Sequence, residues 1–232
     1  ILQLIDCIVN IYTTYMLYND SAQTRPGFLY PPSDMISILS ALRHSVGLSG
    51  FCYNNRMKRL NLPLSKETIA SLKAGDEVLL SGTMYTARDA AHKKMFELIE
   101  KGEKLPVDLK NQTIYYVGPT PPKKGMIIGS AGPTTSSRMD KYTPAILKAG
   151  LKAMIGKGRR GKIVRDAIIK NKAVYFLTYG GAGAYLSKRI KKSQVVAYPE
   201  LGTEAIRKIE VKDFPAIVAI DPKGGVLNEF FN

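Results

Sequence analysis

From residue 77 to the C-terminus, short runs of β-branched and aliphatic residues alternate with segments that repeat apolar residues at helical spacing. This alternation is typical of an α/β domain. It predicts strands at 77–80, 113–117, 126–128, 152–155, 173–178, 195–198 and 216–220. It predicts helices at about 86–100, 143–150 and 162–171. Because hairpin-like spacings occur beside crossover helices, we expect a mixed sheet with flanking helices, although the pattern does not give the strand order.

Two local signals indicate where helices begin. After a predicted turn at 81–83, Thr86 stands three residues before Asp89, which resembles the start of a capping box. Thr143 is expected to be the N-cap of the next helix, with Pro144 at the first helical position.

Charge divides the chain near Met57. Residues 1–56 contain no Lys and no Glu, and their three Asp and three Arg cancel, so the whole net charge of +15 lies after Arg56. Both cysteines also precede Met57. We therefore expect an amino-terminal extension over 1–56, either a docking arm or a non-native segment, and a catalytic domain over 57–232. We favour a natural start at Met57.

Composition excludes several classes of protein. The 45% hydrophobic and 23% charged fractions are those of a globular chain rather than a disordered one. Two cysteines are too few for a disulfide framework or for a site of four thiolates. Residues 1–18 are mostly apolar, but Asp6 interrupts them and no Lys or Arg flanks them, unlike a signal peptide or a membrane span. We expect no membrane role.

The positive charge suits nucleic acid, a small anionic substrate or an acidic protein surface. A recognisable nucleic-acid-binding module would show a basic stripe with interleaved aromatic residues, and the chain shows neither. We therefore expect no nucleic-acid partner.

Three glycine-bearing turns could bind an anion. The first, SGTMYTARD at 81–89, leads into a predicted helix, whose free N–H groups attract anions. Arg88 lies at this end of the helix, where acidic residues are usual, so it is either a solvated residue or a ligand-binding one. His92 is expected to be packed or solvent-facing rather than catalytic.

The second turn reads AGPTTSSRMD at 131–140, where four consecutive hydroxyl residues end at Arg138. Hydroxyls and a guanidinium together suit a carboxylate or a phosphate, because Arg can hold two oxygens in parallel. The alternative is a serine-rich loop with a surface arginine.

The third turn, GKGRRG, runs from Gly156 to Gly161 and matches G-x-G-x-x-G between a predicted strand and a predicted helix. A dinucleotide site of this kind also needs an acidic residue about 20 positions further on. None lies between Asp166 and Glu200, so an NAD site is disfavoured while an NADP site stays open. Gly158 stands where a Walker A loop would need Ser or Thr.

Taken together, SGTMYTARDAAHKK, AGPTTSSRMDKY, IGKGRRG and YPELGTEAIRKIEVKDFPA resemble, in order and spacing, the class I fumarate hydratase β subunit. The same family includes the L-tartrate dehydratase β subunit and the carboxy-terminal domain of single-chain class I fumarases. The resemblance covers the chain from about Met57 to the end. It implies a swivelling β/β/α domain.

The resemblance also implies the site residues. The substrate-binding arginine of the family falls on Arg88, and the threonine and arginine of its GPTTSxRMD string fall on Thr134 and Arg138. The family lysine falls on Lys157, although the segment from Arg138 is one residue shorter here and reads GKGRR rather than KGNR. Thr134 is similar to the residue proposed to transfer a proton, and no metal ligand is expected in this chain.

The implied activity is a hydro-lyase of the tricarboxylic acid cycle, which reversibly hydrates fumarate to L-malate. A partner α subunit would hold a four-iron four-sulfur cluster, and the enzyme would be a cytoplasmic hetero-oligomer active only with that subunit. The absence of cysteine after Met57 agrees with a cluster held by another chain. Two alternatives stay open, an L-tartrate dehydratase β subunit and an NADP-binding protein that uses Gly156 to Gly161.

Overall fold

Strand pairing organises residues 57–227, the part of the chain that this computed structural model describes. The strands are β1 (Lys58–Leu62), β2 (Glu77–Thr86), β3 (Thr113–Tyr115), β4 (Ala153–Gly156), β5 (Val174–Leu177), β6 (Ile190–Ala197) and β7 (Ile206–Ile220). They form a sheet in the order β1-β2-β3-β4-β5-β7-β6. The predicted extension over 1–56 lies outside the described residues.

The sheet is mixed, as the sequence predicted. β1 to β5 are parallel neighbours, whereas β7 is antiparallel to β2, β5 and β6. Because β7 pairs with both β5 and β2, the ladder from β2 through β3, β4, β5 and β7 returns to β2 and closes on itself.

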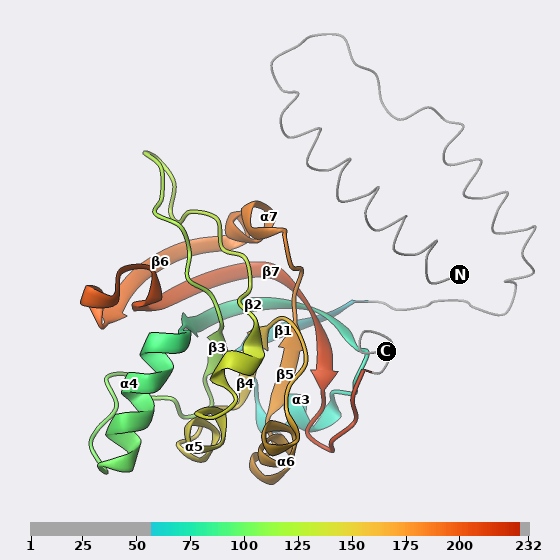
Figure 1. The fold of residues 1–232 in the computed structure, drawn as a ribbon. Helices are drawn as coiled ribbons and strands as arrows, with labels where there is room; N and C mark the ends of the chain where they lie inside the picture. The colour runs from blue at the N-terminus through green and yellow to red at the C-terminus, as the bar shows by residue number, and fades with distance from the viewer. Residues whose placement is uncertain (1–56, 228–232) are drawn as a thin grey trace, which may run out of the picture. The chain divides into compact units, whose positions relative to one another are not determined.

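Helices flank the sheet, which confirms the predicted fold class (Figure 1). They are α3 (Lys66–Ser71), α4 (Asp89–Glu100), α5 (Thr143–Lys148), α6 (Lys162–Asn171) and α7 (Gly183–Lys188), with short 3₁₀ helices η1 (Ser136–Met139) and η2 (Pro199–Glu204). Helix α5 contacts both α4 and α6. Over residues 57–227, no helix has the length and apolar character needed to cross a membrane.

Alternate residues of the central strands enter two separate hydrophobic clusters. In β4, Ala153 and Ile155 join one cluster while Met154 joins the other. In β5, Val174 and Phe176 are likewise separated from Tyr175. Strands buried on both faces appear as continuous apolar runs in sequence. This is why the pattern placed the central strands well.

The predicted turn at 81–83 is wrong, because β2 continues through it to Thr86. Gly82 forms an irregularity in the pairing with β7 and has a φ of 120°. A Cβ atom at this position would overlap the Leu62 carbonyl oxygen, so the glycine permits close contact with β1. The glycine therefore marks a bulge inside a long strand rather than its end.

The predicted strand at 126–128 is also wrong. Met126 and Ile127 are exposed, and the Met126 N–H closes a turn onto the carbonyl of Lys123. The prolines and glycine just before this segment favour turns, and no neighbouring strand pairs with it in the described structure. Its aliphatic residues belong to a loop that projects from the sheet (Figure 1).

Several helix starts and strand lengths differ from the predictions. In β2, for example, the last residue is bonded to a segment distant in the sequence. Thr86 ends β2 instead of capping α4, and its hydroxyl accepts from the Arg207 N–H. The N-cap of α5 is Tyr142, one residue before the expected Thr143. The predicted strands at 195–198 and 216–220 are the ends of the longer β6 and β7. The sequence pattern did not predict β1, α3 or α7.

Candidate active site

The three glycine-bearing segments predicted as turns, far apart in sequence, are linked to one another by ion pairs and backbone hydrogen bonds. The first runs through the end of β2 into α4, the second contains η1, and the third connects β4 to α6. Asp89 joins the first to the second, and a backbone bridge between Thr135 and Lys157 joins the second to the third. The structure therefore brings the expected binding residues into one region of the described chain.

Arg88 and Arg138 share a single carboxylate. Arg88 Nε lies 2.9 Å from Asp89 Oδ2, and Arg138 Nε lies 3.2 Å from Asp89 Oδ1. Although burial by itself raises the pKa of Asp89, the hydrogen bond from Arg88 and the charge of Arg138 hold that pKa below its ordinary value. Guanidinium groups pair well with carboxylates, so this part of the described chain suits a carboxylate ligand.

Arg88 is held from two further sides. It is the N-cap of α4 and also lies 3.3 Å from Glu204 Oε1, while Glu204 Oε2 accepts from the Ala90 N–H at 2.8 Å. Glu204 therefore supplies the cap that the local sequence lacks. A Cβ at Gly118 would lie 2.9 Å from Arg88 Cδ, so glycine there makes room for the arginine.

Thr134 and Lys157 are linked through the backbone. The Thr134 N–H donates to the Tyr116 carbonyl at 2.8 Å, and the Lys157 N–H donates to the Thr134 carbonyl at 3.4 Å. The Lys157 carbonyl in turn accepts from the Ser136 N–H at 2.9 Å. Thr134 is buried with 9% exposure, whereas Lys157 and Arg138 are exposed. The buried threonine is thus bonded through its backbone to one residue with an exposed cationic side chain, and a second such residue follows four positions along the chain.

His92 is a packed residue, one of the two environments expected for it. Burial lowers its pKa to about 4, so the imidazole is neutral at physiological pH. Its Nδ1 lies 3.0 Å from the Arg88 carbonyl oxygen, and its ring packs edge-on against Tyr116 at 5.1 Å. Its Nε2 has no hydrogen-bond partner within the described residues.

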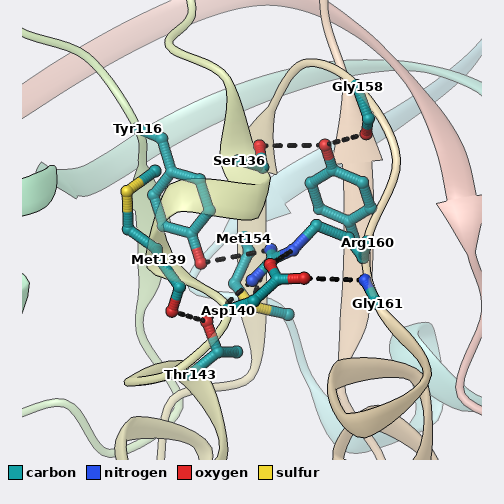
Figure 2. A network of polar contacts seen from close by, with 10 residues as sticks. Tyr116, Ser136, Met139, Asp140, Thr143, Met154, Gly158, Arg160 and Gly161 are labelled. Atoms are coloured by element: carbon teal, nitrogen blue, oxygen red, sulfur yellow. Dashed lines mark hydrogen bonds and ion pairs between the residues drawn. The ribbon is translucent and has the colours of Figure 1, made fainter.

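Arg160, which the sequence pattern does not mark as a site residue, lies in the network of polar contacts shown in Figure 2. Its buried Nε donates to Asp140 Oδ1 at 2.7 Å, and its Nη2 donates to Thr143 Oγ1 at 2.7 Å. The guanidinium also lies over the rings of Tyr116 and Tyr175, at 5.3 and 5.0 Å from the centroids. The sequence shows two adjacent arginines in the third turn but no signal that one of them is buried.

The glycines of the third turn contact the chain itself. A Cβ at Gly156 would overlap Ser136 Oγ, so this glycine accommodates the second turn. The Gly161 N–H at the start of α6 donates to Asp140 Oδ2 at 2.7 Å. In a dinucleotide site these positions approach the pyrophosphate instead. The geometry therefore disfavours the NADP alternative.

The described residues do not suit an iron-sulfur cluster. They contain no cysteine, and no three His, Asp or Glu side chains between residues 57 and 227 gather as a metal site requires. What this region offers is a set of cations and a buried hydroxyl, which fits an anionic ligand.

Comparison with known proteins gives a consistent result. The family model described as Fumarase C-terminus matches residues 44–232. The chain is 44% identical over 177 residues to an anaerobic class I fumarate hydratase of Escherichia coli, which covers 74% of this chain and 32% of that protein. It is 42% identical over 169 residues to fumarate hydratase 2 of Leishmania major, covering 71% of this chain and 30% of that protein.

A third relative is matched over most of its own length. It is a putative L(+)-tartrate dehydratase subunit beta of Methanocaldococcus jannaschii, 38% identical over 175 residues, which cover 73% of this chain and 90% of that protein. By contrast, the chain spans about a third of the length of the fumarate hydratases described above.

Proposed function

The chain belongs to the Fumarase C-terminus family, and from this premise we propose that it is the β subunit of a hydro-lyase that reversibly hydrates fumarate to L-malate. In this proposal a partner α subunit completes the active site and carries the four-iron four-sulfur cluster. The complex is a cytoplasmic hetero-oligomer of α and β subunits. The relative named as a subunit beta, which this chain matches over 90% of its length, supports the subunit role.

The observation that carries the proposal is the shared carboxylate of Asp89. It holds Arg88 and Arg138 on its two oxygens, and the turn that carries Arg138 is bonded through Thr134 to Lys157. A fumarate or malate dianion needs cations at its carboxylates, and these three basic residues supply them. Arg138 and Lys157, being exposed, would meet the substrate first.

Thr134 would transfer the proton at the carbon next to a substrate carboxylate. A threonine hydroxyl is a poor base by itself, so nearby positive charge must favour its alkoxide. Lys157, bonded to it through the backbone, and Arg138, four residues along, are our candidates for that role. The cluster of the partner subunit would supply Lewis-acid chemistry, for which this chain contributes no described ligand.

The test is the Arg138→Ala variant, assayed with the reconstituted α subunit without oxygen. In the proposed complex the α subunit and the bound dianion exclude water from Arg138, and loss of a desolvated arginine from an ion pair costs about 2 to 5 kcal/mol. We therefore expect kcat/KM for fumarate to fall by roughly 30- to 4,000-fold. The control is Arg165→Ala, at an exposed position of α6, which should keep wild-type turnover. Unchanged turnover of Arg138→Ala would remove this residue from the site.

The partner can be tested separately. Purification of the chain from its natural source should recover a second protein with three well-spaced cysteines and an oxygen-sensitive cluster. Recovery of the chain alone, active without any such protein, would contradict the β-subunit role.

L-tartrate is the second candidate substrate. The match to a subunit beta of a putative L(+)-tartrate dehydratase over 90% of its length favours it. The residues that choose between the two substrates would include those of the α subunit. Comparison of kcat/KM for L-malate and for L-tartrate in the same reconstituted complex decides between them.

A further inference from the structure

Arg160 carries a fixed charge in the interior of the domain. Its side chain has 0% exposure, and transfer of a guanidinium out of water is costly unless other groups compensate it. Asp140 supplies the opposite charge, while Thr143 and Tyr116 accept hydrogen bonds from the two terminal nitrogens at 2.7 and 3.4 Å. These three hydrogen bonds hold the Arg160 guanidinium in one orientation.

The partners of Arg160 lie on the second turn and its flanks. Asp140 follows η1 directly, and it also accepts from the Gly161 N–H, so one carboxylate joins η1 to the start of α6. Thr143 begins α5, and its hydroxyl donates to the Met139 carbonyl at 2.9 Å. Arg160 thus supports the buried side of the segment that carries Thr134 and Arg138.

Tyr175 of β5 also connects the second turn to the third. Its hydroxyl hydrogen-bonds to Ser136 Oγ and to the Gly158 carbonyl, both at 2.9 Å. Its ring packs against the Arg160 guanidinium. The second and third turns are therefore fastened together on their buried side (Figure 2). The backbone bridge between Thr135 and Lys157 joins them as well.

We propose that Arg160 is a positioning residue that sets the spacing between Thr134 and Arg138 on one turn and Lys157 on the other. The inference rests on the proposed function, since it assigns a purpose to the spacing of those three groups. Lysine cannot replace Arg160, because a single ammonium does not reach Asp140 and Thr143 in the fixed directions of a planar guanidinium.

The experiment compares Arg160→Lys with Arg165→Lys in the reconstituted complex at 25 °C. Displacement of reacting groups by about 1 Å can cost roughly 100-fold, so we expect Arg160→Lys to lower kcat/KM for fumarate by about that factor. We expect kcat to fall, because Thr134 moves, and KM to rise, because Arg138 and Lys157 move. Arg165→Lys, at an exposed position, should match the wild type.

A merely structural role predicts a different result. In that case activity would fall only in proportion to the unfolded fraction, and cooling would restore it. Full recovery of kcat and KM on cooling overturns the proposal, and so does a kcat/KM within about twofold of Arg165→Lys. If Arg160→Lys does not fold, Thr143→Val removes one acceptor without loss of charge and is judged by the same kinetic criteria.

Hydrogen exchange of the isolated chain separates this inference from the proposed function. We expect Arg160→Lys to raise exchange selectively at the amides of Ser136 and Gly161, which are bound across the two turns, relative to amides of β1 and α3. If the wild-type complex hydrates no fumarate, the proposed function fails while selective exchange still supports the fastening role of Arg160. Unchanged exchange at these two amides overturns that role.

Discussion

His92 links the packing of α4 to the pH of the solution. Its ring is fully buried beside Tyr116, and its Nδ1 contacts the Arg88 carbonyl, so the folded protein contains the neutral imidazole. Burial lowers its pKa from 6.5 to about 4. A proton therefore binds the unfolded chain more tightly than the folded one. The stability from neutral His92 is complete above about pH 6.5 and is lost progressively as the pH falls to 4.

We predict that the free energy of unfolding decreases by about 3 kcal/mol from this group between pH 7 and pH 4. His92→Asn, which keeps a donor for the Arg88 carbonyl but does not titrate, should lack this part of the decrease. His44→Asn is the control, because His44 is the only other histidine in the sequence. Urea titrations at a series of pH values measure the effect, and an undiminished decrease in His92→Asn would show that another group is responsible.

The sequence alone identifies candidate binding residues when their local context is unusual, as for Arg88 and Arg138. It does not identify Arg160, whose burial depends on contacts with residues distant in the chain. Arg88 stands out in the sequence because it is a cation at a helix start, and Arg138 because it ends a run of hydroxyl residues. Arg160 carries no such mark, because its partner Asp140 is 20 residues away in the chain. Nothing local distinguishes it from the adjacent exposed Arg159.

The second turn rests directly on the backbone of β4. A Cβ at Gly156 would overlap Ser136 Oγ and would lie 3.0 Å from a ring carbon of Tyr116. Ser136 is fully buried and is held there by Tyr175. The position of η1 therefore depends on the absence of a side chain at the end of β4.

We predict that Gly156→Ala destabilises the domain by about 1 to 3 kcal/mol through overpacking. Ser136→Ala alone should cost about 1 kcal/mol, because it removes a buried hydrogen bond. The double variant should cost about 1 kcal/mol less than the sum, since the clashing hydroxyl is then gone. Urea unfolding of the four proteins gives the cycle, and strict additivity would rule out the clash between the new methyl group and the Ser136 hydroxyl as the cause.

The bulge in β2 gives a third prediction at this scale. Gly82 and Gly102 both have positive φ, 120° and 69°, but only Gly82 has backbone atoms near its absent Cβ. Gly102→Ala should therefore cost about 1 kcal/mol for backbone conformation alone. Gly82→Ala should cost about 2 to 4 kcal/mol, because the methyl group also meets the Leu62 carbonyl. Equal losses in urea unfolding would contradict the steric account.

Helices and strands were predicted well where their own apolar pattern shows which residues are buried. Helix α6 was placed at its observed bounds, and β4 and β5 within a residue or two, because their apolar residues follow the spacing of a buried helix face or of a strand buried on both faces. β7 was predicted only in its last third, since Pro215 and the alternating charges before it resemble a break. The loop around Met126 was misjudged because aliphatic residues there are exposed.

Within residues 57–227, the closed ladder of β2, β3, β4, β5 and β7 separates two hydrophobic clusters. Among the described residues, members of these clusters begin with Leu60 in β1. Leu62, Leu64 and Ile69, from β1 to α3, belong to the same cluster as Phe214 of β7. The start of the described region is thus packed against its last strand.

We predict that a chain beginning at Met57 unfolds cooperatively in urea, as expected if the composition change near this residue marks a domain boundary. A chain beginning at Lys73 serves as the comparison, because it lacks β1 and α3 and so removes Leu62, Leu64 and Ile69 from the core. That shorter chain should give a broad transition or none. A broad transition for the chain beginning at Met57 would instead place part of the core before it.

The alternation of buried and exposed residues along the second turn has a practical consequence for protein engineering. Thr134 and Ser136 are buried in the domain, whereas Thr135 and Ser137 are exposed. Under the proposed function, directed evolution toward a larger hydroxy acid therefore has two positions whose side chains are not packed in the scaffold. A library of all residue pairs at Thr135 and Ser137 contains on the order of 400 combinations, few enough for direct screening. It leaves the buried residues Thr134 and Ser136, which pack the turn onto the domain, unchanged.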